Sequence, residues 1–204
     1  MKVLEWQRFL QEQRAKHGKL VFTICELANA ARTSTQALNV ELSRLMKRGL
    51  IMRYAQGRYG AIEGVAPEDV LPLIDSSAYI TGFYALHRHN LTTQVPSEIT
   101  CFTRRRHNRS RERLSPLGKF VFVCVSPEIY ARPNQGLVSA AEQALCDFFY
   151  LTRRQSLDAQ ALVTFRNLDR LKARRLDRIL ARYPKTVAEA VRRLVHYEAV
   201  GGKR

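Results

Sequence analysis

The sequence predicts an α+β protein in which a helical domain with a β-hairpin precedes a mixed α/β domain. Three observations lead to this prediction. Apolar residues recur at helical spacing in several segments, and the spacing changes to that of short strands directly after Gly49. A stretch with Gly64, Pro67 and Pro72, at 63–72, separates the two halves of the chain. The 204 residues suffice for two small domains, which we place at 1–65 and 73–204.

The charge balance predicts an anionic partner. Lys and Arg total 34 against 18 Asp and Glu, which gives a formal net charge of +16. A field of this sign attracts polyanions, nucleic acid first, and then anionic membranes or acidic proteins. The plain alternative is a basic protein without such a partner. The charge therefore favours a class of partner without deciding which one.

The cysteines and the apolar runs predict a cytoplasmic protein. The four cysteines are scattered and have no C-x-x-C spacing, so we expect reduced thiols rather than a disulfide framework. The longest apolar run, FVFVCV at 120–125, is too short to span a bilayer. The charged N-terminal segment lacks the pattern of a signal peptide. We therefore expect no contact with a membrane.

Helices open the first domain. Apolar residues near one face of the N-terminal segment predict a helix that ends at His17 and Gly18. Thr23 and Glu26 then have the spacing of a capping box, in which each residue bonds the backbone of the other, and predict a short second helix.

A third helix and a hairpin complete this domain. Thr33 and Gln36 repeat the capping-box spacing, and Gly49 should end the helix. LIMRY and RYGAI, on either side of a turn with Gly57, predict two short strands of a β-hairpin. Helix, helix, turn, helix and hairpin is the order of a winged helix-turn-helix. The sequence therefore predicts that fold for residues 1–65.

The third helix has an apolar side and a polar side. Leu38, Leu42 and Leu45 fall on one side, whereas the opposite side is neutral or positive and has Glu41 at its edge. Amide and hydroxyl side chains can bond base edges, and Arg and Lys suit guanine and phosphate. A solvated helix in a protein-interaction domain is the alternative. The predicted DNA contacts, from the helix and the hairpin, are Thr33, Ser34, Thr35, Gln36, Asn39, Ser43, Arg44, Lys47, Arg53 and Arg58.

The second domain is predicted to hold a small sheet and a helical C-terminal half. Strands fit EITCFTRR and GKFVFVCVS, with a basic insertion between them. SAAEQALCDFFYL predicts an amphipathic helix. Further helices are expected over 77–91, 168–183 and 186–197.

The densest positive charge lies in TRRRHNRSRER. It is either a solvated loop between strands or a second contact with DNA backbone, RNA or another partner, and the two interpretations carry equal weight. The arginines concerned are Arg104, Arg105, Arg106, Arg109, Arg111 and Arg113.

The sequence gives little support for catalysis or metal binding. His87 and His89 diverge on a helix and have no further ligand nearby in the chain, so we predict no metal and no cofactor. Glu142 and Asp147 lack the same-face spacing of a carboxylate pair, and Asp147 should cap a helix or pair with an arginine. No phosphate-binding loop or nucleophile motif is present, so we predict a protein that is not an enzyme.

The second half of the chain resembles a known family. SSAYITGFYALHRHNLT, LVSAAEQALCDFFYL and NLDRLKARRLDRILARYPKTVAEAVRRL are similar to three segments of AbiEi-type antitoxins, which belong to type IV toxin–antitoxin systems. The second segment places Glu142, Ala144, Leu145, Asp147 and Tyr150 in matching positions. It departs from the pattern by having Gln143 where the family usually has Lys, and Ala141 where it often has Pro.

The resemblance implies two roles. The winged domain would repress its own operon by binding the promoter in double-stranded DNA. The AbiEi-like domain at 73–204 would counter a nucleotidyltransferase-like AbiEii toxin, without necessarily forming a stable complex with it. A stand-alone transcriptional regulator is one alternative, and an RNA-binding protein that uses the arginine run is another.

Overall fold

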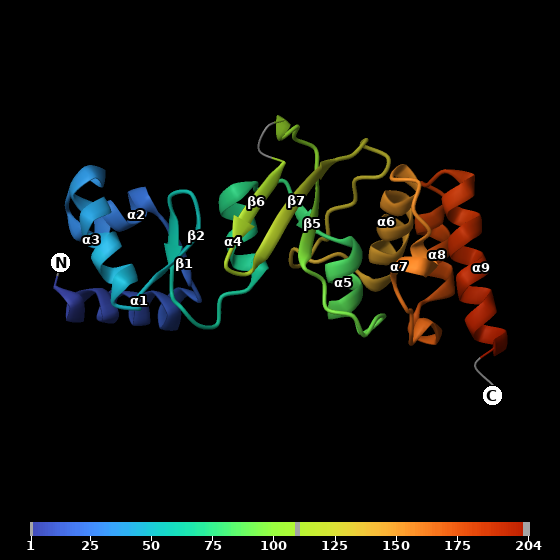
Figure 1. Ribbon diagram of the computed structural model, residues 1–204, viewed down its shortest axis with the longest axis horizontal. Coiled ribbons are helices and arrows are strands. Elements are labelled where there is room, and N and C mark those ends of the chain that lie inside the picture. The colour runs from blue at the N-terminus through green and yellow to red at the C-terminus, as the bar shows by residue number, and fades with distance from the viewer. Residues whose placement is uncertain (1, 109–110, 202–204) are drawn as a thin grey trace. The chain divides into compact units, whose positions relative to one another are not determined.

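The computed structural model is a mixed α+β protein, as the sequence predicts (Figure 1). The structure describes residues 2–108 and 111–201, with side chains as far as residue 196. The described chain forms two compact units. The first holds the chain up to Ser76 together with Arg113–Gly118, and the second holds Ser77–Glu112 and the chain from Lys119 onward.

The first unit contains the predicted helices and hairpin, together with one strand and one helix that were not predicted. Its strands form a sheet in the order β1-β3-β2, with both pairs antiparallel. The elements are α1 (Val3–His17), β1 (Val21–Thr23), α2 (Ile24–Ala31), α3 (Thr35–Lys47), β2 (Met52–Ala55), β3 (Arg58–Gly60) and α4 (Pro67–Ile74).

Local sequence accounts for several of these elements. The backbone N–H of Glu26 donates to Thr23 Oγ1 at 3.2 Å and the N–H of Thr23 donates to Glu26 Oε2 at 2.8 Å, which confirms the capping box of α2. β1 can lie against β3 because Gly60 has no side chain. A Cβ at Gly60 would stand 2.3 Å from the carbonyl oxygen of Leu20.

The segment 63–72, predicted as a linker, runs into helix α4. Pro67 fits the first turn of a helix, where its missing N–H costs nothing, and Asp69 Oδ2 accepts from the N–H of Ala66 at 2.8 Å. This helix belongs to the first unit, which continues to Ser76. The predicted linker is therefore wrong in its second half.

The second sheet has the order β4-β5-β7-β6. β5 and β7 are the two predicted strands, and they are parallel, with Glu98 opposite Lys119 and Thr103 opposite Cys124. The remaining elements are β4 (Tyr79–Ile80), α5 (Gly82–Arg88), β5 (Glu98–Thr103), β6 (Glu112–Ser115), β7 (Gly118–Cys124), α6 (Ala141–Arg154), α7 (Ala159–Leu162), a 3-10 turn (Leu168–Arg170), α8 (Ala173–Leu180) and α9 (Lys185–Gly201).

Two predicted elements of this half differ in the structure. The helix expected over 77–91 is shorter, because Ile80 pairs with Cys101 in the sheet and α5 begins only at Gly82. The α6 helix is not simply amphipathic, since every residue from 142 to 149 is buried. It packs against α5, α8 and α9 and forms the centre of the second core.

Candidate nucleic-acid interface

Helix α3 begins one residue later than its predicted cap. Arg32 adopts a left-handed conformation with φ of 49°, and the N–H of Thr33 then donates to the carbonyl of Ala28 at 3.1 Å. Ser34 is the N-cap, because its Oγ accepts from the N–H of Ala37 at 3.3 Å. The capping role predicted for Thr33 is therefore wrong, and the turn places Ser34, Thr35 and Gln36 at the exposed start of the helix.

The two sides of α3 are as the periodicity predicts. Leu38, Leu42 and Leu45 are at most 3% exposed and lie in the core of the first unit. The polar side is exposed, and within the described chain the side chains of Gln36, Asn39, Arg44 and Lys47 make no hydrogen bond or ion pair. Ser43 differs, since its hydroxyl donates to the carbonyl of Asn39 at 2.9 Å. Most of this surface is thus available to a ligand.

One acidic residue of α3, at the edge of that surface, is bonded to helix α1. Glu41 Oε1 accepts from the indole N–H of Trp6 at 2.6 Å, and Trp6 is 1% exposed. The bond fixes α3 against α1 and engages one oxygen of a half-buried carboxylate, which also lines the cavity beside α3. The exposed side of α3 therefore carries basic side chains with one engaged carboxylate at its edge, and the helix dipole adds positive partial charge at the start of the helix.

The two hairpin arginines differ in their surroundings. Arg53 is exposed, and its Nε donates to the carbonyl of Ala55 at 3.4 Å. Arg58 is half-buried, and its guanidinium donates to the carbonyls of Leu73 at 2.8 Å and Gly57 at 3.2 Å. Leu73 lies in the last turn of α4, where carbonyls lack helical partners. Arg58 thus holds α4, a role that its place in the sequence does not suggest.

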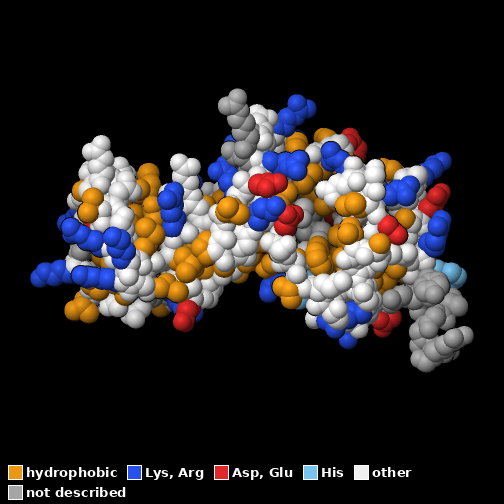
Figure 2. Space-filling model, in the orientation of Figure 1, with side chains coloured by type: hydrophobic (Ala, Val, Ile, Leu, Met, Phe, Trp, Pro, Cys, Tyr) orange, Lys and Arg blue, Asp and Glu red, His pale blue; other side chains and the backbone are white. Residues whose placement is uncertain are grey.

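The structure adds residues that the sequence analysis did not select. A cavity of about 530 Å³ beside α3 is lined by Val40, Glu41, Arg44 and Arg48 of this segment and by Lys2 near α1. Val40 is 56% exposed and lies on the polar side of the helix. In Figure 2 the Lys and Arg side chains of the first unit gather over the region of α1 and α3. Lys2 is far from α3 in the sequence and is brought beside these residues only by folding, so the spacing of residues in the sequence could not have indicated it.

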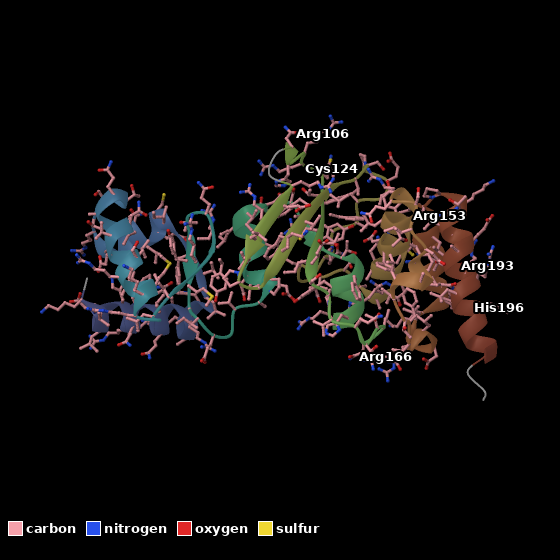
Figure 3. The ribbon with its side chains drawn as sticks, viewed as in Figure 1. Arg106, Cys124, Arg153, Arg166, Arg193 and His196 are labelled. Carbon is pink, nitrogen blue, oxygen red and sulfur yellow. The ribbon has the colours of Figure 1, made fainter. Side chains whose placement is uncertain are left out.

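The arginine run is not one solvated loop. Arg104, Arg105 and Arg106 are exposed, and Figure 3 shows Arg106 at the outer end of the connection between β5 and β6. Arg111 is exposed, and its carbonyl accepts from the N–H of Phe122 at 2.8 Å. Arg113 is half-buried on β6. Arg109 lies outside the described residues.

Asp147 contradicts its predicted role. It is fully buried, and three side chains donate to its carboxylate: Thr81 at 2.6 Å, Gln143 at 2.9 Å and the hydroxyl of Tyr183. Burial raises its pKa to about 7, against these hydrogen bonds and the nearby charge of Arg182, which lower it. The carboxyl neither caps a helix nor pairs directly with an arginine, because the arginine is reached through Gln143.

The other residues considered for chemistry are spread through the fold. His89 Nε2 lies 2.7 Å from the carbonyl oxygen of Ser139. Within residues 2–108 and 111–201 no group of three or more His, Cys, Asp or Glu side chains is placed to hold a metal ion. The four cysteines are free thiols.

None of the helices that the structure describes combines the length and the apolar character needed to cross a membrane.

Comparison of the chain with protein-family models finds no match, and neither does comparison with curated proteins. The resemblance to AbiEi-type antitoxins therefore remains a prediction from the residues.

The residues that carry this resemblance have structural roles. Glu142 Oε1 accepts from the N–H of Lys172 at 3.0 Å, so its carboxylate stands at the start of α8. Ala144 and Leu145 are fully buried, and Tyr150 stacks edge-on against Tyr183 and Phe102. In this chain these residues thus serve the packing around α6.

Proposed function

We propose that the first unit is a winged helix-turn-helix domain that binds double-stranded DNA through the exposed side of α3, and that the chain is a cytoplasmic repressor of its own operon. The observation that carries this proposal is the exposure of the polar side chains on that side of the helix. Gln36, Asn39, Arg44 and Lys47 are exposed together, while Trp6 engages the carboxylate of Glu41. This is the donor-rich surface that a major groove accepts.

The element order supports the same proposal. Strand β1 precedes α2, α3 follows a short turn, and the β2–β3 hairpin follows α3. In this order α3 corresponds to the recognition helix and the hairpin to the wing. Arg53 is the hairpin arginine suited to a phosphate, since Arg58 is engaged by the end of α4.

We further propose that the chain is the antitoxin of a nucleotidyltransferase-like toxin. Support comes from the residues that resemble AbiEi-type antitoxins. The proposed mechanism in both roles is binding rather than catalysis.

The DNA-binding proposal is tested by fluorescence anisotropy with a duplex from upstream of the gene and a scrambled duplex of equal length, titrated with salt. We expect tighter binding to the upstream duplex at physiological salt. Asn39→Ala should lose about 1–3 kcal/mol of discrimination between the two duplexes. Arg44→Ala should weaken both and reduce the salt slope by about one. The matched control is Arg193→Ala, an exposed arginine of α9 (Figure 3), which should bind as wild type does.

The wing gives a second contrast in the same assay. Arg53→Ala should weaken binding to both duplexes with little loss of stability, because it removes an exposed phosphate contact. Arg58→Ala should instead lower the free energy of unfolding by about 1.5–3 kcal/mol, the range for hydrogen bonds from a charged group. If Asn39→Ala, Arg44→Ala and Arg53→Ala all bind like wild type, the α3 assignment fails.

Two outcomes would favour the alternatives. Loss of RNA binding on replacing Arg104, Arg105 and Arg106 by Ala, with DNA binding absent throughout, would support the RNA-binding function. Substitution is preferable to deletion of 104–113, because the deletion would remove part of β6. The antitoxin role is tested by co-expression with the product of the neighbouring gene. Wild type and Asn39→Ala should both relieve its toxicity, and no relief by wild type would favour a stand-alone regulator.

A further inference from the structure

A pocket in the second unit has the size of a small-molecule site. Its volume is about 580 Å³, and it is formed by the segment 131–140 together with α6, α8 and Arg182 just beyond α8. Pockets of this size hold nucleotides and other ligands of similar mass. It is separate from the α3 surface, and the proposed function makes no use of it.

The charge of the pocket is one-sided. Arg132, Arg175, Arg178 and Arg182 line it, and its described lining contains no Asp or Glu. Arg175 faces Glu142, with 3.5 Å between Nε and Oε2. Arg132 and Arg178 have no acidic partner among the described residues. Four guanidinium groups around one pocket favour a ligand with several negative charges, and their planar N–H groups match phosphate oxygens.

A buried network holds one of these arginines in place. Gln143 is 5% exposed, and its Oε1 accepts from Arg182 Nη2 at 2.5 Å. The amide nitrogen of Gln143 in turn donates to Asp147, which Thr81 and Tyr183 also bond. Arg182 is therefore oriented from the interior, as a prepared binding site requires.

The segment that forms the outer wall is also fixed. The N–H of Ile80 donates to the carbonyl of Leu137 at 2.7 Å, and the N–H of Ser139 donates back to the carbonyl of Ile80 at 2.8 Å. At its other end, the N–H of Ala131 donates to the hydroxyl of Tyr79 at 3.3 Å. Although it forms no helix or strand, this wall is tied to β4 at both ends. The pocket is thus part of the fold.

We propose that this pocket binds a nucleoside triphosphate. The arginines would hold the phosphates, and the apolar surfaces of Pro133, Val138 and Ile179 would cover a base or sugar. The amides of Asn134 and Gln135, also in the lining, can bond base edges or sugar hydroxyls. A concave site with an apolar wall suits a free nucleotide better than it suits the backbone of a duplex, which has no unstacked base to fill such a site. The proposal stands independently of the DNA-binding role of α3.

Isothermal titration calorimetry on the full chain tests this proposal, with ATP, GTP, CTP and UTP, and with tripolyphosphate and adenosine as partial ligands, all at physiological salt. We expect at least one nucleoside triphosphate to bind at least about tenfold more tightly than tripolyphosphate, and adenosine to give no signal. Arg132→Ala and Arg178→Ala should each weaken nucleotide binding by about tenfold or more. The matched control Arg193→Ala should leave it unchanged, and the thermal midpoints of all three variants should equal that of wild type.

Three results would overturn the proposal. The absence of heat with all four nucleotides would exclude the ligand class. Equal affinity for tripolyphosphate and nucleotides would reduce the pocket to an inorganic phosphate site. Loss of duplex binding in Arg132→Ala and Arg178→Ala, without nucleotide binding in wild type, would assign the arginines to nucleic acid. Asn39→Ala separates the two proposals, because it should retain nucleotide binding whether or not α3 binds DNA.

Discussion

Helices α3 and α6 both carry polar residues among apolar ones, but the two sets have opposite surroundings. On α3, Gln36 and Asn39 are exposed, and their side chains have no hydrogen-bond partner in the described chain. On α6, Gln143 and Asp147 are buried and bonded to one another and to further side chains. Polar residues at helical spacing therefore do not by themselves show whether their side chains are exposed or what those side chains do. Both depend on how many other elements pack around the helix.

The contrast has an energetic consequence. Truncating an exposed side chain without intramolecular bonds leaves the fold intact, so its effect is confined to binding. Truncating a buried hydrogen-bond acceptor leaves donors without a partner in a medium where water cannot replace it. Substitutions on α3 should therefore act on ligands, and those on α6 on stability first.

The largest expected effect is that of Asp147→Ala. Thr81, Gln143 and Tyr183 would lose their common acceptor, at a cost of about 1–3 kcal/mol for each unsatisfied group. We expect the free energy of unfolding to fall by about 3–5 kcal/mol in urea titrations. Asp147→Asn keeps the shape and one acceptor oxygen, and should cost clearly less. An Asp147→Ala variant as stable as the α3 variant Asn39→Ala would refute the contrast between the helices.

The second prediction concerns pH. The carboxyl of Asp147 has an ordinary pKa of 3.8, which burial raises to about 7 in the folded chain. Between these two pH values the folded chain binds a proton that the unfolded chain has released. The contribution of this group to stability should therefore be largest below pH 4, fall as the pH rises toward 7, and then level off.

Urea midpoints measured from pH 4.5 to 7.5 for wild type and Asp147→Asn isolate this contribution, because all other groups are shared. The difference, wild type minus variant, should decrease as the pH rises. A difference that is constant across this range would show that Asp147 is ionised throughout. No corresponding trend is expected for Gln36→Ala, which removes an exposed neutral residue of α3.

The sequence predicted the helices of the first unit best. Their caps are local, as with Thr23 and Glu26, and the three leucines of α3 repeat at a regular spacing. The hairpin was also predicted, since its turn contains Gly57. The missed strand β1 has three residues, too few for a period, and it forms only because β3 lies beside it without a side chain at Gly60.

The polar network of the second unit could not be predicted in the same way. Thr81, Gln143 and Tyr183 come from three distant parts of the chain, and only the packing of α6 at the centre brings them together. The site on α3 was predictable in its exposed residues. The roles of Arg58 and Glu41 were not, because each depends on a contact with another element, α4 or Trp6.

The smallest expected effect concerns α3 itself, where one polar residue stabilises the helix rather than binding a ligand. Ser34→Ala removes the N-cap bond to Ala37 and should lower the free energy of unfolding by about 1 kcal/mol. Thr33→Ala, one residue earlier, removes no cap and should cost less than half of that. Both are measured by urea denaturation, with Gln36→Ala as the exposed control. Equal losses at Thr33 and Ser34 would restore the capping position that the sequence predicted. A loss at Ser34 alone would show that the turn after Arg32, rather than the spacing to Gln36, determines where the helix begins and hence which side chains its first turn exposes.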